Sequence, residues 1–292
     1  MFSKLKQKGD KKMKKTLILV LAVIMAVGCV FAFTACNNQK NDYKVGVQSG
    51  TTGQYFVEGD ADWGFDGFSN IDCKGYNNGG LAVQDMLAGQ IDFVVIDEAP
   101  AKKLAQTIKG IKVIDIKLTD EEYAFGVDKN QPELLAAANL ALSTMKANGT
   151  FDAIINKYFG GEGEITGITS ATYDANKAQL VVATNAQFAP FEYKIGDKFA
   201  GVDMEIAKVI ADTLGMELVI MDMDFEAVVT SVGKNGVDIA MAGLTVNETR
   251  KQSVNFSDSY YNAAQMIIVK ADDTTFDSCT TADDVIKVMK KA

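Results

Sequence analysis

The sequence contains no histidine and only four cysteines in 292 residues. A Ser-His-Asp or Cys-His catalytic centre is therefore excluded, because in both an imidazole activates the nucleophile. The usual zinc clusters are excluded as well, because Cys29 and Cys36 lie in an N-terminal segment and leave only Cys73 and Cys279 for the rest of the chain. We expect no metal and no cofactor.

The first forty residues differ in composition from the rest. A lysine-rich start is followed by an apolar run over 16–33 and then by Thr-Ala before Cys36. A basic region, an apolar region and a small residue before a cysteine are typical of an export signal whose cysteine receives a lipid. We therefore expect a lipoprotein signal peptide over 1–35, lipidation at Cys36 and a tether over 36–42.

Alternatives remain open at this end of the chain. Cleavage before Cys29 would leave an apolar stretch at the mature N-terminus. The apolar run could also stay in place as a membrane anchor, although about 18 residues are barely enough to span a bilayer. Translation could begin at Met1 or at Met13.

Removal of residues 1–35 makes the chain more acidic. These residues hold seven lysines and one aspartate, which leaves 22 basic and 37 acidic residues and a net charge of −15. Such a charge argues against nucleic acid or an anionic membrane surface as partner. Export permits a disulfide between Cys73 and Cys279, but no spacing supports one, so we expect two free thiols.

The segment from Gly236 to Tyr261 carries the most specific pattern in the chain. An apolar stretch over 237–241 predicts a buried strand, which is followed by Gly243, Thr245 and Arg250. Turn N–H groups, a hydroxyl and a guanidinium can converge on a small anion, and the planar fork of arginine suits a carboxylate. The alternative is a surface turn in which Arg250 pairs with Glu248 or Asp258.

This segment resembles the carboxylate-binding segment of the amino-acid-binding proteins of ABC transporters, solute-binding protein family 3. The surrounding residues 180–270, with LVVAT and GVDMEIAKVIADTLG, resemble the first half of that family. Residues 43–160, which run from YKVGVQSGTTGQYF to AIINKYFGG, resemble its second half. The halves therefore stand in reversed order, as in a circular permutation.

The resemblance implies a two-lobed, periplasmic-binding-protein-like (class II) α/β fold, circularly permuted, with a ligand cleft between the lobes. One lobe comprises 43–118 and is completed by 267–292. The other is continuous over 119–266 and includes a Gly-, Thr- and Ser-rich linker over 160–179, a composition that suits a flexible connection. The chain is expected to cross between lobes near 123–127 and 263–269. A swapped dimer and a gene assembled from fragments of two binding proteins remain alternatives.

The resemblance also assigns roles to site residues. The α-carboxylate of an amino acid would bind Arg250, Thr245 and the backbone of Gly243. Its α-ammonium would bind Asp97, at the end of the predicted strand IDFVVID, although Asp97 could instead cap the helix that begins near Pro100.

Further positions complete the expected cleft. Thr51 and Thr52 precede a helix whose N-terminal N–H groups favour an anion. Phe188 and Phe225 match two aromatic positions that sandwich the ligand, and otherwise they would belong to the core. Asn185 stands where several relatives carry an acid, which puts a cationic-ligand pocket in doubt, and Glu226 could supply a compensating charge.

These assignments predict extracytoplasmic binding of a polar or charged L-amino acid by a lipid-anchored protein that delivers it to an ABC transporter permease. No covalent chemistry is required, so we expect no enzyme. One rival is a dehydratase that acts on a prephenate-like carboxylate, which would need Glu226 or Glu58 as general acid. Another is a ligand-sensing lipoprotein. Which amino acid is bound depends on pocket shape and is not encoded in these motifs.

Overall fold

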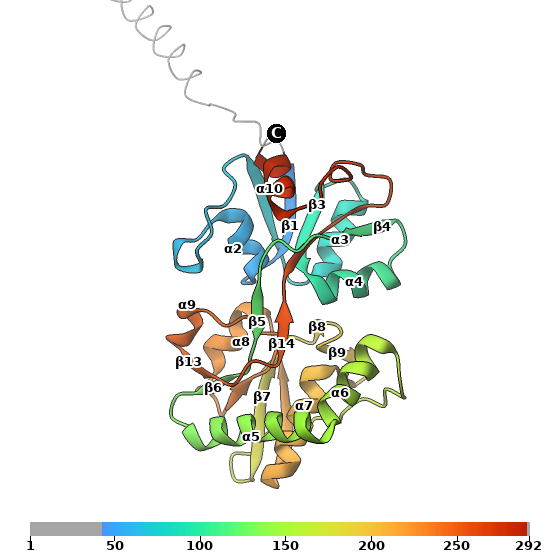
Figure 1. Cartoon of the computed structure of the whole chain (residues 1–292). Coiled ribbons are helices and arrows are strands. Elements are labelled where there is room, and N and C mark those ends of the chain that lie inside the picture. The colour runs from blue at the N-terminus through green and yellow to red at the C-terminus, as the bar shows by residue number, and fades with distance from the viewer. Residues whose placement is uncertain (1–42, 291–292) are drawn as a thin grey trace, which may run out of the picture. The chain divides into compact units, whose positions relative to one another are not determined.

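A computed structural model describes residues 43–290. The predicted signal peptide, the lipidation site at Cys36 and the tether over 36–42 lie outside the described residues. Residues 43–290 form two α/β lobes joined by two extended strands (Figure 1). Within this range no helix has both the length and the apolar character that a bilayer crossing requires.

The first lobe is built on a five-stranded sheet in the order β2-β1-β3-β15-β4. Strand β1 runs parallel to β2 and β3, and β15 runs antiparallel to β3 and β4. The strands are β1 (Tyr43–Gln48), β2 (Ile71–Tyr76), β3 (Phe93–Asp97), β4 (Ile111–Ile114) and β15 (Gln265–Lys270). The helices are α2 (Thr52–Glu58), η1 (Ala61–Trp63), α3 (Gly79–Leu87), α4 (Glu98–Thr107) and α10 (Ala282–Lys290).

Strand β3 shows why this sheet is covered on both faces. All five of its residues are buried, as expected for a central strand with helices on either side. Successive side chains point to opposite faces. Accordingly Val94 and Ile96 join one hydrophobic cluster, while Phe93 and Val95 join another that includes Val285 of α10.

The second lobe contains a sheet in the order β11-β7-β12-β6-β13. Strands β11 and β12 run parallel to β7, and β6 runs antiparallel to β12 and β13. The strands of this sheet are β6 (Gly126–Asp128), β7 (Gln179–Thr184), β11 (Glu217–Asp222), β12 (Ile239–Ala240) and β13 (Val254–Phe256). The helices are α5 (Pro132–Asn148), α6 (Thr150–Ile155), η2 (Asn156–Gly160), α7 (Val202–Leu214), α8 (Phe225–Ser231) and α9 (Glu248–Lys251). A small sheet comprises β8 (Gln187–Phe188), β9 (Glu192–Ile195) and β10 (Lys198–Ala200).

The strand predicted over 237–241 is shorter in the structure, where β12 covers only Ile239–Ala240. Beyond it the chain turns at Gly243, whose φ of 54° lies in the left-handed region. A Cβ at this position would lie 2.9 Å from the ring of Phe188. The turn that presents the following residues to the cleft therefore depends on glycine.

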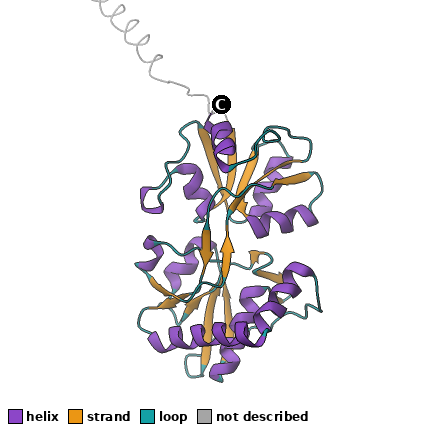
Figure 2. Cartoon of the chain, viewed as in Figure 1, coloured by secondary structure: helices purple, strands orange, loops and turns teal. Residues whose placement is uncertain are grey.

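Two strands connect the lobes as an antiparallel ribbon. Strand β5 (Glu121–Tyr123) pairs with β14 (Tyr261–Ala263), as Figures 1 and 2 show between the two sheets. The crossings predicted near 123–127 and 263–269 are displaced by a few residues, because β6 and β15 already belong to the two sheets.

The Gly-, Thr- and Ser-rich stretch after η2 is not a free tether. It forms no long helix or strand, but Ile168 pairs with Phe199 of β10. The N–H of Ala171 donates to the carbonyl of Leu218 at 2.8 Å. These bonds hold the stretch along the second lobe.

Both described cysteines, Cys73 and Cys279, are free thiols, in agreement with expectation. Burial, and secondarily the nearby Glu58, raises the pKa of Cys73 to about 12. The Cys73 thiol is therefore protonated and unreactive at neutral pH.

Candidate functional site

A small cavity lies where the two lobes meet. Its volume of about 10 Å³ is roughly the space that one water molecule needs. Eight residues line it, and all of them belong to the set predicted from the sequence: Thr51, Thr52, Asp97, Phe188, Phe225, Gly243, Thr245 and Arg250. The ninth predicted residue, Asn185, is not part of the lining.

Arg250 is a buried cation, 8% exposed. It lies on α9, whose N-cap Asn247 accepts a hydrogen bond from the Arg250 N–H at 2.8 Å. Its guanidinium donates from Nη1 to the carbonyl of Thr245 at 2.9 Å and from Nη2 to the carbonyl of Gly50 at 3.0 Å. The second bond joins the two lobes, because Gly50 lies in the loop between β1 and α2.

No ion pair involving Arg250 occurs among the described residues. Its neighbour Glu248 pairs instead with Lys251 at 2.7 Å. The alternative of a surface turn with a paired arginine is therefore wrong. Burial lowers the pKa of Arg250 to about 10, so the guanidinium keeps its charge at neutral pH and lacks an anionic partner in this part of the chain.

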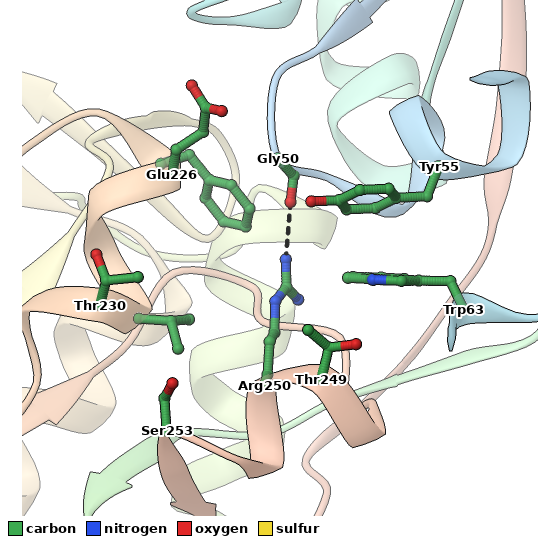
Figure 3. Close-up of a pocket in the computed structure, with 10 residues that line it drawn as sticks. Gly50, Tyr55, Trp63, Glu226, Thr230, Thr249, Arg250 and Ser253 are labelled. Carbon is green, nitrogen blue, oxygen red and sulfur yellow. Dashed lines mark hydrogen bonds between the residues drawn. The ribbon is translucent and has the colours of Figure 1, made fainter. Parts of the chain in front are cut away.

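Aromatic rings flank the Arg250 guanidinium. Its Cζ atom lies 5.0 Å from the ring centroid of Trp63 and 5.3 Å from that of Phe225, distances at which a cation is attracted by the ring face. Trp63 in turn stacks on Tyr55, with centroids 4.3 Å apart. Figure 3 shows the side chain of Arg250 beside Trp63, with Tyr55 next to Trp63.

A larger pocket, which we call the outer pocket, adjoins Arg250 and its flanking rings and has a volume of about 240 Å³. Its walls include Tyr55 and Trp63 from the first lobe, and Glu226 and Thr230 from the second. Sequence reasoning missed Tyr55 and Trp63. The available signal was that Trp63 is the only tryptophan of the chain and lies in a loop rich in glycine and aspartate.

Asp97 ends strand β3 and is 4% exposed. It occupies the N-cap position of α4, but its side chain makes no capping hydrogen bond. Its Oδ1 accepts instead from the hydroxyl of Tyr123 at 2.5 Å, so the helix-cap alternative is wrong. Burial, followed by the negative charge of Glu121, raises the pKa of Asp97 to about 7.

The two threonines of the first lobe differ in what they contact. The Thr51 hydroxyl donates to the carbonyl of Gln48 at 2.8 Å. The Thr52 hydroxyl donates across the lobes to the Thr245 hydroxyl at 3.2 Å. Both residues are buried at the start of α2.

Gly243 and Phe188 form a second-lobe wall of the cavity. The N–H of Gly243 donates to Oδ2 of the buried Asp203 at 3.0 Å. The predicted contact between this N–H and a ligand carboxylate is therefore not available in this conformation. Phe188 is buried and also contacts Phe191, so it serves both as core and as cavity wall.

Asn185 is fully buried beside the cavity lining. Its Oδ1 accepts from Nε2 of Gln48 at 3.1 Å, and its Nδ2 donates to the carbonyl of Met223 at 2.8 Å. Asn185 therefore connects the lobes, and both of these hydrogen bonds are to protein groups. Sequence reasoning did not identify its partner Gln48.

Glu121 is a second buried acid at the site, and sequence reasoning missed it. Its Oε2 accepts from the Thr245 hydroxyl at 2.7 Å. Its Oε1 accepts from the Thr119 hydroxyl at 2.6 Å and from Nε2 of Gln265 at 3.1 Å. A run of two glutamates before Tyr123, in a strand expected to cross between lobes, was the only sequence signal.

Polar contacts hold the lobes together around the cavity. In addition to the bonds already described, Asn77 donates to Asp224 at 3.3 Å and Asn78 donates to Gln187 at 2.6 Å.

The described residues contain no cluster of three or more His, Cys, Asp or Glu side chains placed to hold a metal. The site therefore offers one buried cation and buried carboxylates, in a cleft that must open to admit anything larger than water.

Comparison with known proteins gives this site a context. The chain is 40% identical over 106 residues to the arginine-binding extracellular protein ArtP of Bacillus subtilis (strain 168), which is 36% of this chain and 42% of that protein. It is 30% identical over 113 residues to a probable histidine-binding protein of Neisseria gonorrhoeae, which is 38% of this chain and 40% of that protein. The chain thus spans less than half the length of these relatives.

Among solved structures, an ancestral arginine-binding protein bound to glutamine is 36% identical, with a TM-score of 0.28, and the match covers 29% of this chain and 38% of that one. The bacterial extracellular solute-binding proteins, family 3, match this chain over residues 7–161 and 180–292. That match takes in most of the 292 residues, and the described part forms two α/β lobes with a cavity between them. The chain belongs to the bacterial extracellular solute-binding proteins of family 3.

Proposed function

We propose that this protein binds a free polar or charged L-amino acid between its lobes and delivers it to the permease of an ABC transporter. The observation that carries the proposal is the pairing, in one cavity, of the buried cation Arg250 from the second lobe with the buried acid Asp97 from the first. An amino-acid zwitterion carries the complementary charges. A buried guanidinium without an acid is costly unless a ligand neutralises it.

In this proposal the α-carboxylate binds the Arg250 guanidinium and the α-ammonium binds Asp97. Phe188 and Phe225 flank the rest of the ligand, and Thr51, Thr52 and Thr245 supply hydroxyls. Because the cavity holds only about 10 Å³, the lobes must separate to admit the ligand. The ligand then replaces lobe-to-lobe contacts such as that between Arg250 and Gly50.

Closure around the ligand would be the signal that the permease reads. A ligand that contacts both lobes favours the closed state by the difference in its contacts between states. The ribbon of β5 and β14 is the connection about which the lobes would turn.

We infer that L-arginine is the first ligand to test, because several similar proteins are named for arginine binding. Asn185 does not supply an acid for a cationic side chain, and Glu226 lines the outer pocket rather than the cavity. The cavity itself contains Asp97 as its acid. Specificity for arginine thus depends on how the opened cleft rearranges around Glu226.

Isothermal titration calorimetry of residues 37–292 with each of the twenty L-amino acids tests the function. Half a dozen charge-assisted hydrogen bonds, offset by the entropy of association, correspond to micromolar or tighter binding. We expect such binding for arginine or a few other polar amino acids. If none of the twenty binds to a cooperatively folded protein, the proposal is wrong.

The dehydratase alternative gains no support from the geometry. It would need Glu226 or Glu58 as general acid, and neither lines the cavity between the lobes. Glu58 accepts a hydrogen bond from Gln54 at 3.0 Å, on α2. The named relatives are amino-acid-binding proteins.

The circular permutation is part of the same proposal. In support, the family matches in two separate stretches, and the residues between them connect η2 to β7. Asn70 of the first lobe donates to the carbonyl of Met289 at 2.8 Å, so the end of α10 lies beside the chain that follows α2. The lobe boundaries near 118–119 and 266–267 remain predictions.

A reordered chain tests this part. It would begin at residue 180, join residue 290 to residue 43 and end at residue 160. We expect it to unfold cooperatively and to bind the same amino acid. A reordered chain that does not fold would contradict the permutation, and a dimer of the natural chain in size-exclusion chromatography would favour the swapped arrangement.

Lipid anchoring at Cys36 and an extracytoplasmic location with removal of residues 1–35 complete the proposal. They are supported by the basic and apolar N-terminal pattern. A Cys36→Ala variant expressed in a Gram-positive host should appear in the medium, while the parent protein stays with the membrane fraction. Equal retention of both would contradict lipidation at Cys36.

A further inference from the structure

The proposed function gives no role to Glu121, although its carboxylate accepts three hydrogen bonds. It is 6% exposed and lies on β5, one of the two strands that connect the lobes. It does not line the cavity but reaches it through the hydroxyl of Thr245, 2.7 Å from its Oε2. Glu121 can therefore act on a ligand through Thr245.

An ionised carboxylate accepts hydrogen bonds and cannot donate them. Three donors converge on Glu121, from Thr245, Thr119 and Gln265, so both of its carboxylate oxygens accept hydrogen bonds. A threonine hydroxyl has a single proton. The hydroxyl proton of Thr245 is therefore used in its hydrogen bond to Glu121.

The other side of the Thr245 oxygen can then only accept. It does so in the structure, where the Thr52 hydroxyl donates to it at 3.2 Å. An amino acid between the lobes would meet Thr245 as an acceptor, which suits the α-ammonium and not the α-carboxylate. This differs from the role expected from the sequence, in which Thr245 assisted Arg250 with the carboxylate.

We propose that Glu121 is a positioning residue that fixes the polarity of the Thr245 hydroxyl, so that Thr245 joins Asp97 in binding the α-ammonium of the ligand. The inference rests on the proposed function. It also explains why an acid occupies a connecting strand at this point, since Glu121 ties Thr245 of the second lobe to Gln265 at the start of β15 in the first.

Glu121→Gln is the informative substitution, because it keeps the shape and removes the charge. The amide oxygen should face the two donors at Thr119 and Gln265. The Thr119 hydroxyl is held in this orientation because its oxygen already accepts from the Gln265 N–H at 2.8 Å. The new NH₂ group then faces Thr245 and forces its proton toward the ligand.

The test is a double-mutant cycle measured by calorimetry with L-arginine, or with the tightest-binding amino acid if that is another. The proteins are the parent, Glu121→Gln, Thr245→Val and the double variant. We expect Glu121→Gln to weaken binding by about tenfold or more, the loss of roughly one charge-assisted hydrogen bond. In the Thr245→Val background the same change should alter Kd by less than about threefold.

The neighbouring Glu122→Gln is the matched control. Glu122 lies on the same strand but is exposed, and its carboxylate accepts from the Ser259 hydroxyl at 2.8 Å. We therefore expect the Kd of the Glu122→Gln variant to match that of the parent. Melting temperatures of all variants establish that each is folded.

The possible results separate cleanly. Equal weakening by Glu121→Gln in both backgrounds would mean that its charge acts directly on the ligand or on the fold, and would overturn the positioning role. An unchanged Kd for Glu121→Gln would also overturn it. If the parent protein binds none of the amino acids, the proposed function itself fails and this inference fails with it.

Discussion

The two lobes contribute opposite halves of the cavity. The first lobe supplies the acid Asp97 at the end of β3, together with Thr51 and Thr52. The second supplies the cation Arg250 on α9, together with Thr245. Neither lobe alone carries both complementary charges, so under the proposed function tight binding should require both lobes and couple ligand affinity to closure.

The lobes also differ in how their charges are held. Arg250 is fixed by two backbone carbonyls and two aromatic rings, and none of these groups can titrate near neutral pH. Asp97 is held by Tyr123 beside a second acid, Glu121, and its pKa is raised to about 7. The cationic half of the cavity should thus be independent of pH, while the anionic half should respond to it.

Removal of the cation should have the largest effect. Truncation of one partner of a buried charge pair costs about 2–5 kcal/mol, so we expect Arg250→Ala to weaken amino-acid binding at least about thirtyfold in calorimetry. The exposed neighbour Lys251→Ala is the matched control and should bind like the parent. An Arg250→Ala protein that folds and keeps full affinity would remove the central role of the second lobe.

Replacement of the acid should have a smaller effect that depends on pH. Only the ionised form of Asp97 attracts an ammonium, so parent affinity should fall as the pH drops below about 7. We expect Asp97→Asn to weaken binding by about tenfold at pH 8 and to abolish the pH dependence between pH 5.5 and 8. A pH profile that is the same in both proteins would show that another group titrates.

The raised pKa values also make a prediction about stability. Asp97 and Asp203 both have pKa values near 7, chiefly because of burial, above the value of 3.8 expected in the unfolded chain. Between these values the folded protein binds more protons than the unfolded one, so the contribution of these two acids to stability falls as the pH rises and levels off above about 7. Burial also raises the pKa of Glu192 well above its ordinary range, in the same direction.

Urea unfolding at several pH values between 5 and 8 measures how the free energy of unfolding changes with pH. We expect the free energy of unfolding to be greater at pH 5 than at pH 8. Asp97→Asn should reduce the slope between pH 5 and 6 by about one proton, or about 1.4 kcal/mol per pH unit. Stability that rises over this pH range would contradict the assignment of these buried acids as protonated.

Eight of the nine residues expected at the site line one cavity, and they could be selected from the sequence because they belong to local patterns. Asp97 ends an apolar strand, and Gly243, Thr245 and Arg250 lie within one short segment. The two-lobed fold followed from the same family resemblance and is confirmed by the two sheets and by the family match.

The contacts that the sequence did not predict are those between distant segments. Glu121 and Thr245 are 124 positions apart, and Arg250 and Gly50 are 200 apart. Nothing near Glu121 reveals that its carboxylate meets a threonine of another segment. The same applies to Gln48 and Asn185, whose side chains share one hydrogen bond across the lobes.

The smallest predicted effect concerns the loop that carries Trp63. This residue belongs to the first lobe but lies against Arg250 of the second, and it is the only tryptophan in the chain. Its fluorescence should therefore report on the distance between lobes without any label. We expect the emission to shift when the amino acid is added and the lobes rearrange around it.

A Trp63→Phe variant keeps an aromatic ring against Arg250, so it should bind with less than about a threefold change in Kd, while the fluorescence signal disappears. Exposed cation–π contacts contribute about 0.5–1 kcal/mol, so Trp63→Ala should weaken binding by about two- to fivefold. If emission stays constant while calorimetry detects binding, the loop does not move relative to Arg250. In that case the lobes would open about an axis that leaves Trp63 and Arg250 together, and the outer pocket would stay intact in both states.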